Sequence, residues 1–136
     1  MESRSTYLII TNNPLVVRCM PRDFAVEYEN ITYREILVKV RDKVYGGHRL
    51  YTHPLAGSVK PNETPYKSVV ISKLPKKMEL DEAAIISSSI ETFDKFKPIV
   101  RQLPERVLKD FQLIDYTLLC GAVGVDAVAG LSNRNE

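Results

Sequence analysis

Short apolar runs alternate with amphipathic helical patterns along the chain, and this alternation restricts its fold more than any other feature. Tyr7–Ile10 is a continuous apolar run, and Phe24–Glu29 alternates apolar with other residues, so both segments predict strands. Between Thr32 and Val44 the apolar residues recur instead at helical spacing. Because a strand, helix, strand order normally joins parallel strands through a right-handed crossover, we expect an α/β fold.

The rest of the chain extends the same pattern. Thr32 and Glu35 predict a capping box at the start of a helix that ends at the glycine pair 46–47. Strands are then expected at Arg49–His53 and from Tyr66 or Ser68 to Ser72. Further helices are expected over Pro14–Met20, over Asp81–Lys97 with Asp81 as cap, and from Pro104 to Gly121 and Gly124. These elements predict a small, mostly parallel sheet of about four strands flanked by helices, Rossmann-like with three layers, with the direction of the fourth strand left open.

Length and composition favour an ordinary globular chain. The 136 residues fit a single domain over 1–136, with a frayed tail at 131–136. The net charge of +2, with both signs mixed, disfavours a nucleic-acid binder, and the lysines at 73, 76, 77, 95 and 97 are interpreted as solvated surface. The sequence has neither an apolar run long enough for a membrane span nor a signal-peptide core, so we expect a cytoplasmic protein.

The cysteines and histidines form no pattern typical of a metal site. Cys19 and Cys120 are far apart and each has an apolar neighbour, so we expect reduced, buried thiols. His48 and His53 are separated by an odd offset, which places their side chains on opposite faces of a strand. We therefore expect no metal, and the sequence indicates no particular cofactor.

The segment from His53 to Ser68 is the strongest candidate for a functional surface. It is a long connection without a helix of its own, three prolines restrict its backbone, and it is rich in hydrogen-bond donors. It follows one strand, whereas Thr11–Pro14 follows another, and ligands of α/β sheets sit beyond the carboxyl ends of strands. A rigid surface turn with local backbone bonds is the alternative. The expected ligand-binding residues are Asn12, Asn13, His53, Gly57, Ser58, Lys60, Asn62 and Lys67.

Two ionisable residues need separate interpretation. His53 is the candidate catalytic residue because imidazole titrates near neutral pH, although it can equally pin the loop to its strand. Asp115 lies at the edge of an apolar stripe, so we expect it to be exposed or bonded to a tyrosine or lysine.

Four stretches of the sequence resemble the GrdX family, and the likeness spans most of the chain. They are Ile9–Pro14, Gly47–Leu50, Thr52–Ser68 and Asp110–Asp115. The resemblance implies a small protein encoded beside glycine, sarcosine or betaine reductase components in amino-acid-fermenting anaerobes. It implies no activity and carries over no catalytic residue.

Two functional hypotheses follow. The first is an accessory or regulatory protein whose loop 53–68 binds a partner, such as those reductase components, or a small polar or anionic ligand. The alternative is a small enzyme in which His53 is the acid or base, and Ser58, Lys60 or Asn12 positions an anionic metabolite. A concave pocket with His53 bonded to a second titratable group would favour the enzyme. The sequence leaves the oligomeric state open.

Overall fold

The computed structural model describes residues 4–57, 60–97 and 102–132, which form five α-helices and a small sheet. The elements are η1 (Arg4–Thr6), β1 (Tyr7–Thr11), α1 (Pro14–Cys19), β2 (Ala25–Tyr28), α2 (Tyr33–Tyr45), β3 (Ser68–Ser72), α3 (Leu80–Asp94), α4 (Glu105–Val123) and α5 (Ala127–Ser132). Among the described residues, no helix has both the length and the apolar character needed to cross a membrane.

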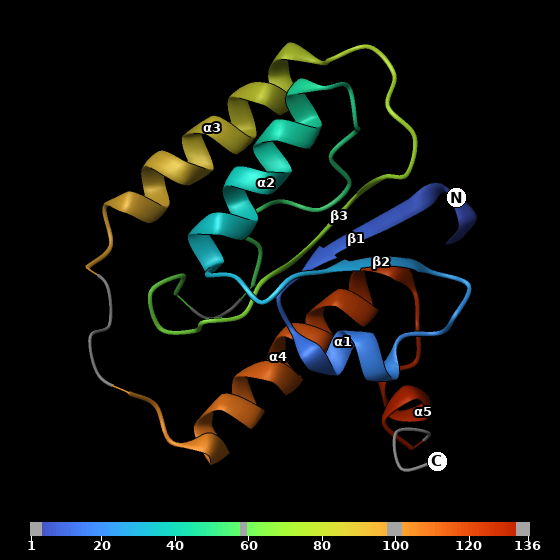
Figure 1. Ribbon diagram of the computed structural model, residues 1–136, viewed down its shortest axis with the longest axis vertical. Coiled ribbons are helices and arrows are strands. Elements are labelled where there is room, and N and C mark those ends of the chain that lie inside the picture. Colours follow the sequence, from blue (N-terminus) through green and yellow to red (C-terminus); the bar gives the residue numbers. More distant parts are fainter. Residues whose placement is uncertain (1–3, 58–59, 98–101, 133–136) are drawn as a thin grey trace.

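The sheet has three strands in the order β2-β1-β3, with β1 at the centre (Figure 1). β1 pairs with β2 in parallel, Leu8 lying opposite Ala25, because α1 provides the crossover between them. β1 pairs with β3 in antiparallel fashion, Thr11 lying opposite Ser68. The carboxyl end of β1 therefore meets the beginning of β3, where the connection 53–68 ends.

The expectation of about four mostly parallel strands was wrong. Arg49–His53 is not a strand of the sheet, and only Leu50 forms an isolated antiparallel bridge, with Ile71. The ladder fails there because the Val70 amide donates to the Thr52 hydroxyl at 3.0 Å instead of to a backbone carbonyl. Both neighbouring amides, of Tyr51 and Thr52, then share the Val70 carbonyl as acceptor. The sheet is mixed because β1 runs parallel to β2 and antiparallel to β3.

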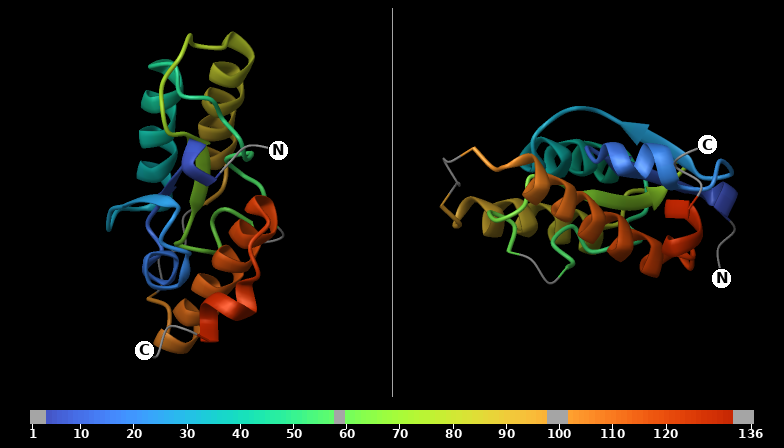
Figure 2. Two further views of the ribbon diagram at one scale, coloured as in Figure 1. Left: turned by 90° about the vertical axis from the view of Figure 1, so that its right-hand side faces the viewer. Right: turned by 90° about the horizontal axis from the view of Figure 1, so that it is seen from below.

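Helices cover both faces of the sheet. α2 and α3 pack side by side on one face, and α1 and α4 lie on the other (Figures 1 and 2). Alternate residues of the strands point to opposite faces, so Ile9 and Val70 join the core beneath α1 and α4, whereas Ile10 and Val69 join the core beneath α2 and α3. Cys19 and Cys120 are buried in the first core and are not joined in a disulfide.

The ends of the helices follow local chemistry. The Thr32–Glu35 capping box is present, the Thr32 hydroxyl accepting from the Glu35 amide at 3.1 Å. The C-terminal stop uses Gly47, whose φ of +105° and close approach to the Lys76 carbonyl exclude a side chain.

The other expected helix boundaries need correction. α3 begins at Leu80, so Asp81 is not its cap but places a negative charge in its first turn. The helix ends at Asp94 and not at the expected Lys97. Gly121 lies inside α4, and the left-handed Gly124 ends that helix. α5 includes residues 131 and 132 of the expected tail, and residues 133–136 lie outside the described part.

Candidate ligand-binding site

Asn13, at the end of β1, caps α1 and holds α4 in place. Its Oδ1 accepts from the Leu15 amide at 3.0 Å, as an N-cap residue does. Its Nδ2 donates to the Gln112 carbonyl at 2.9 Å and to the Asp115 carboxylate at 3.0 Å. Its amide oxygen and amide nitrogen are thus both occupied by the protein, and Asn13 has a structural role.

Asn12 joins two connections to the same strand end. Its Nδ2 donates to the carbonyls of Ile31, at 2.8 Å, and Pro65, at 2.9 Å, while its Oδ1 accepts from the Lys67 amide at 2.8 Å. The segment before α2 and the segment before β3 are therefore fixed relative to each other at the carboxyl end of β1.

Asp115 of α4 completes this network. Its carboxylate accepts from the Ser68 amide at 3.1 Å, from the Ser68 hydroxyl at 2.7 Å and from Asn13. Because the Ser68 hydroxyl donates to Asp115, the Thr11 hydroxyl must donate to Ser68 Oγ, 2.7 Å away. Burial raises the pKa of Asp115, while the bonds from Asn13 and Ser68 and the charge of Lys67 act in the opposite direction. We call these residues, with Asn12, the strand-end network.

Lys67 is buried beside this network, with only 6% of its surface exposed. Its ammonium donates to the Ala56 carbonyl at 2.9 Å and lies 6.0 Å from the centre of the Tyr33 ring. Burial lowers the pKa of Lys67, and the Asp115 carboxylate opposes that shift. Lys67 and Asp115 line a hollow of about 20 Å³, which has room for about one water molecule and cannot hold a metabolite.

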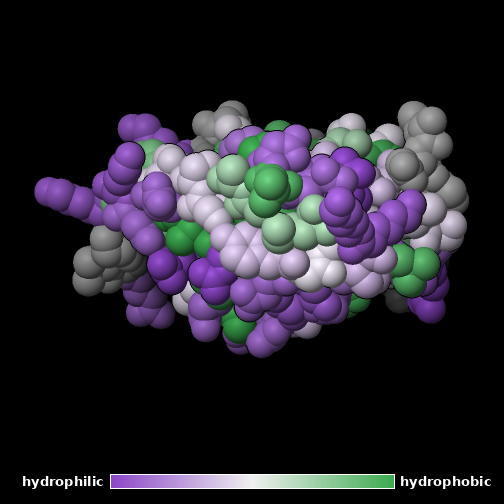
Figure 3. Space-filling model, turned by 90° about the horizontal axis from the view of Figure 1, so that it is seen from above, coloured by the Kyte–Doolittle hydropathy of each residue, from purple (hydrophilic) through white to green (hydrophobic). Residues whose placement is uncertain are grey.

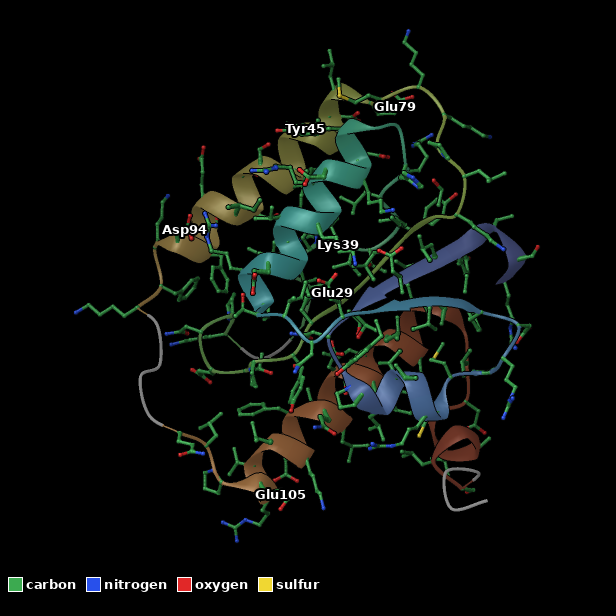
Figure 4. All side chains as sticks on the ribbon, in the orientation of Figure 1. Glu29, Lys39, Tyr45, Glu79, Asp94 and Glu105 are labelled. Atoms are coloured by element: carbon green, nitrogen blue, oxygen red, sulfur yellow. The ribbon has the colours of Figure 1, made fainter. Side chains whose placement is uncertain are left out.

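A much larger groove of about 900 Å³ lies next to this hollow, and Tyr33, Thr64 and Tyr66 line both. The groove is bounded by residues 61–66, by residues 30–35 at the start of α2, and by residues of α3, α4 and the segments that flank them. Asp94 and Glu105 mark the ends of α3 and α4 on this side of the molecule (Figure 4). The volume of the groove lies within the range of roughly 300–1,000 Å³ that is typical of small-molecule sites.

The groove combines aromatic surface with polar groups. Tyr33 and Phe93 stack with ring centres 5.1 Å apart, and Tyr66 and Phe96 add further aromatic surface. Asn62 donates to the Lys97 carbonyl at 2.8 Å, but its Oδ1 is buried and has no hydrogen-bond partner among the described residues. A buried acceptor without a donor is unusual in a folded protein, and a bound ligand is one way to satisfy it.

The charges that line the groove are mainly negative. Glu35, Glu63 and Asp94 contribute carboxylates, and Arg34 is the one cationic side chain among the described residues that line the groove. Arg34 is already held by Asp94 through bonds of 2.8 and 3.0 Å. The lining therefore favours a neutral or cationic ligand over an anion.

The structure brings some of the expected ligand-binding residues together and separates others. Asn12 and Asn62 line the groove, whereas Gly57 and Lys67 line the hollow. Lys60 is exposed and lines neither cavity. Ser58 lies outside the described residues.

His53 also lies outside both cavities. It is exposed, and its Nδ1 accepts a local bond from the Leu55 amide at 3.1 Å. In the described part of the chain it is bonded to no second titratable group. The described residues also contain no cluster of three or more His, Cys, Asp or Glu side chains that could hold a metal ion.

Sequence reasoning missed the walls that the helices contribute. Arg34, Phe93 and Gln102 line the groove, but each lies in or beside a segment that gave only a helical signal. Asp115 was expected to be exposed or bonded to a tyrosine or lysine, whereas it is bonded to Asn13 and Ser68. The sequence clue to this role was the position of Asp115 at the edge of an apolar stripe.

The raised pKa of Asp115 predicts a particular pH dependence of stability. A carboxyl group whose pKa is higher in the folded state stabilises the fold below its ordinary pKa of 3.8, and this contribution is lost as the pH rises through the folded-state value. We expect the melting temperature of the parent, relative to Asp115→Asn, to fall as the pH rises from about 4 to about 8. Asp110→Asn, on the exposed side of α4, should show no such trend. A difference that widens in favour of the parent with rising pH would contradict this assignment.

A family model described as GrdX-like protein matches residues 8–124, which run from the second residue of β1 to the end of α4 and include the described residues of both cavities. Searches of curated proteins and of solved structures found no match to the chain.

Proposed function

The chain belongs to the GrdX-like family, and we propose that it is an accessory or regulatory protein that binds a small polar molecule in the groove beside residues 61–66. The observation that carries this proposal is the buried, unpartnered Oδ1 of Asn62 in the lining of a cavity large enough for a metabolite. The family resemblance supplies the proposed context, in which the protein acts beside glycine, sarcosine or betaine reductase components.

The lining suggests the chemistry of the ligand. A donor such as N–H or O–H on the ligand would satisfy Asn62 Oδ1. The aromatic side chains favour an apolar or cationic portion, and the carboxylates favour an ammonium over an anion. A small amine or amino acid fits these requirements better than a phosphate or a simple carboxylate.

The pre-formed walls of the groove support binding without a large rearrangement. Asn12 fixes the Ile31 and Pro65 carbonyls, and Asn62 fixes the Lys97 carbonyl, which follows α3. A groove with fixed walls requires little ordering when a ligand enters, which favours affinity. The geometry offers no comparable support for an enzyme based on His53, because that side chain lines neither cavity.

The test is a calorimetric titration of the full chain with glycine and sarcosine, whose ammonium groups carry N–H donors, with betaine, whose quaternary ammonium carries none, and with acetate as the anion that lacks an amine. We expect glycine or sarcosine to bind and to bind more tightly than betaine, because only the first two can donate to Asn62 Oδ1, and we expect acetate not to bind. Asn62→Ala should weaken binding by about tenfold, because one buried hydrogen bond is lost. Lys60→Ala is the matched control from the same loop and should bind like the parent.

Three results would contradict the proposal: no binding of any amine, stronger binding of acetate, or equal losses in Asn62→Ala and Lys60→Ala. Because Asn62 also holds the Lys97 carbonyl, a melting curve of Asn62→Ala must accompany the titration. Phe93→Leu leaves that bond intact and removes an aromatic ring from the lining, so its affinity reports on the groove independently.

A further inference from the structure

The connection between β3 and α3, residues 73–79, exposes apolar side chains to an unusual degree. Leu74 is 71% exposed, and Leu80, which opens α3, is 77% exposed. With Val128 they are the most exposed large apolar side chains in the described part of the chain. Single exposed apolar residues are normal, but two so close in sequence, with the partly exposed Met78 between them, suggest a surface that a partner covers.

Three lysines lie on the same connection. Lys73, Lys76 and Lys77 are exposed, and their ammonium groups make no ion pair or hydrogen bond with any described residue. Arg49, by contrast, is paired with Glu82 at 2.9 Å. The connection therefore presents unneutralised positive charge beside apolar surface, which complements an acidic partner.

The backbone of this connection is held in place although its side chains are exposed. The Lys73 amide donates to the Thr6 carbonyl at 2.8 Å, and the Lys76 amide donates to the Gly47 carbonyl at 2.9 Å. The Ser72 hydroxyl donates to the Leu74 carbonyl at 2.9 Å. A connection fixed at three points presents its side chains in a defined arrangement, and a partner does not have to order it on binding.

Its place in the molecule leaves it accessible. Figure 4 places Tyr45, at the end of α2, and Glu79, just before α3, at the same end of the helix pair, opposite the end that carries Asp94 at the groove. Seen from above, this side of the molecule shows hydrophobic atoms surrounded by hydrophilic ones (Figure 3). A partner bound here would leave the groove open.

We propose that the β3–α3 connection is a docking surface for an acidic segment of a partner protein that also carries apolar side chains. Carboxylates of the partner lie against the three lysines, and its apolar side chains cover Leu74 and Leu80. Recognition of an anionic membrane usually needs roughly four to eight clustered basic residues, more than the three lysines of this connection.

The experiment is a titration of the isotope-labelled full chain, followed by NMR, with a synthetic peptide in which glutamate and leucine alternate. We expect shifts confined to residues 73–81 and the segments that hold them. Changing all three lysines to glutamate should weaken binding by about tenfold, since each exposed pair contributes modestly. Leu74→Ser should weaken it as well, while matched peptides with lysine for glutamate, or with serine for leucine, should bind poorly.

The control variant carries Arg18→Glu, Arg22→Glu and Lys95→Glu, which change the net charge equally at exposed positions elsewhere. Val128→Ser is the apolar control. Both controls should bind the peptide like the parent. Equal loss in the controls, shifts outside the connection, or binding to anionic vesicles or single-stranded DNA in place of the peptide would overturn the proposal. The spectra report folding of each variant, and Leu74→Ser keeps the test decisive if the triple lysine variant unfolds.

Discussion

Asp115→Ala is expected to lower the free energy of unfolding by roughly 3 kcal/mol or more, because each buried donor left without an acceptor costs about 1 to 3 kcal/mol, and this corresponds to a fall in melting temperature of about 10 °C. The carboxylate is the acceptor for the Ser68 amide, the Ser68 hydroxyl and the Asn13 amide group. Removing it leaves these buried donors without partners and deprives the buried Lys67 of a nearby counter-charge. Thermal and urea denaturation would measure the loss.

Asp110→Ala provides the matched control. Asp110 is an exposed carboxylate on the same helix, so its removal should change stability by about 0.5 kcal/mol or less. If both variants unfold with the same small loss, the strand-end network contributes far less than its bonding suggests.

Gly47→Ala is expected to destabilise the fold by roughly 2 to 3 kcal/mol or more. A Cβ at this position would lie 1.9 Å from the Lys76 carbonyl oxygen, and the φ of +105° is one that residues with side chains rarely adopt. The obstructing atom belongs to the backbone, so relief requires that the β3–α3 connection moves away from the end of α2. The variant should show a lower midpoint in urea.

Gly121→Ala should have the opposite effect. Gly121 lies inside α4, and no described atom beyond its own helical turn and chain neighbours lies within 4 Å of the position that a Cβ would take, so alanine adds only helix propensity. We expect a gain of about 0.5 to 1 kcal/mol. A loss at Gly121 similar to that at Gly47 would show that the contact with Lys76 does not decide the result.

The helices were more predictable from the sequence than the sheet. The capping box at Thr32 and the glycine stop at residues 46–47 are local signals, and both were confirmed. The pairing of β3 with β1 depends on how the long connection 53–68 turns the chain, which no local pattern encodes. Arg49–His53 has strand-like composition, but the Thr52 hydroxyl takes the bond that a backbone carbonyl would need for a ladder.

The candidate site was predictable only in part, for a similar reason. The polar residues after β1 and within the connection stood out in the sequence, and several of them lie at one end of the sheet. Whether a side chain faces a cavity or the protein depends on partners that are distant in sequence. Asn12 lines the groove, but its side-chain Nδ2 already donates to the carbonyls of Ile31 and Pro65. The side-chain oxygen and nitrogen of Asn13 are both hydrogen-bonded to α1 and α4.

The strand-end network also affects the order in which the chain can fold during synthesis. Asn12 and Asn13 emerge from the ribosome before their partners, because Asn12 needs Lys67 and Asn13 needs Asp115, which lies 102 positions further along the chain. Contacts between such distant residues form slowly, because a long loop must close first. Before α4 has emerged, α2 can form with its own capping box, but Ser68 has no carboxylate to accept its amide. The nascent protein therefore cannot complete the strand-end network until α4 has been translated.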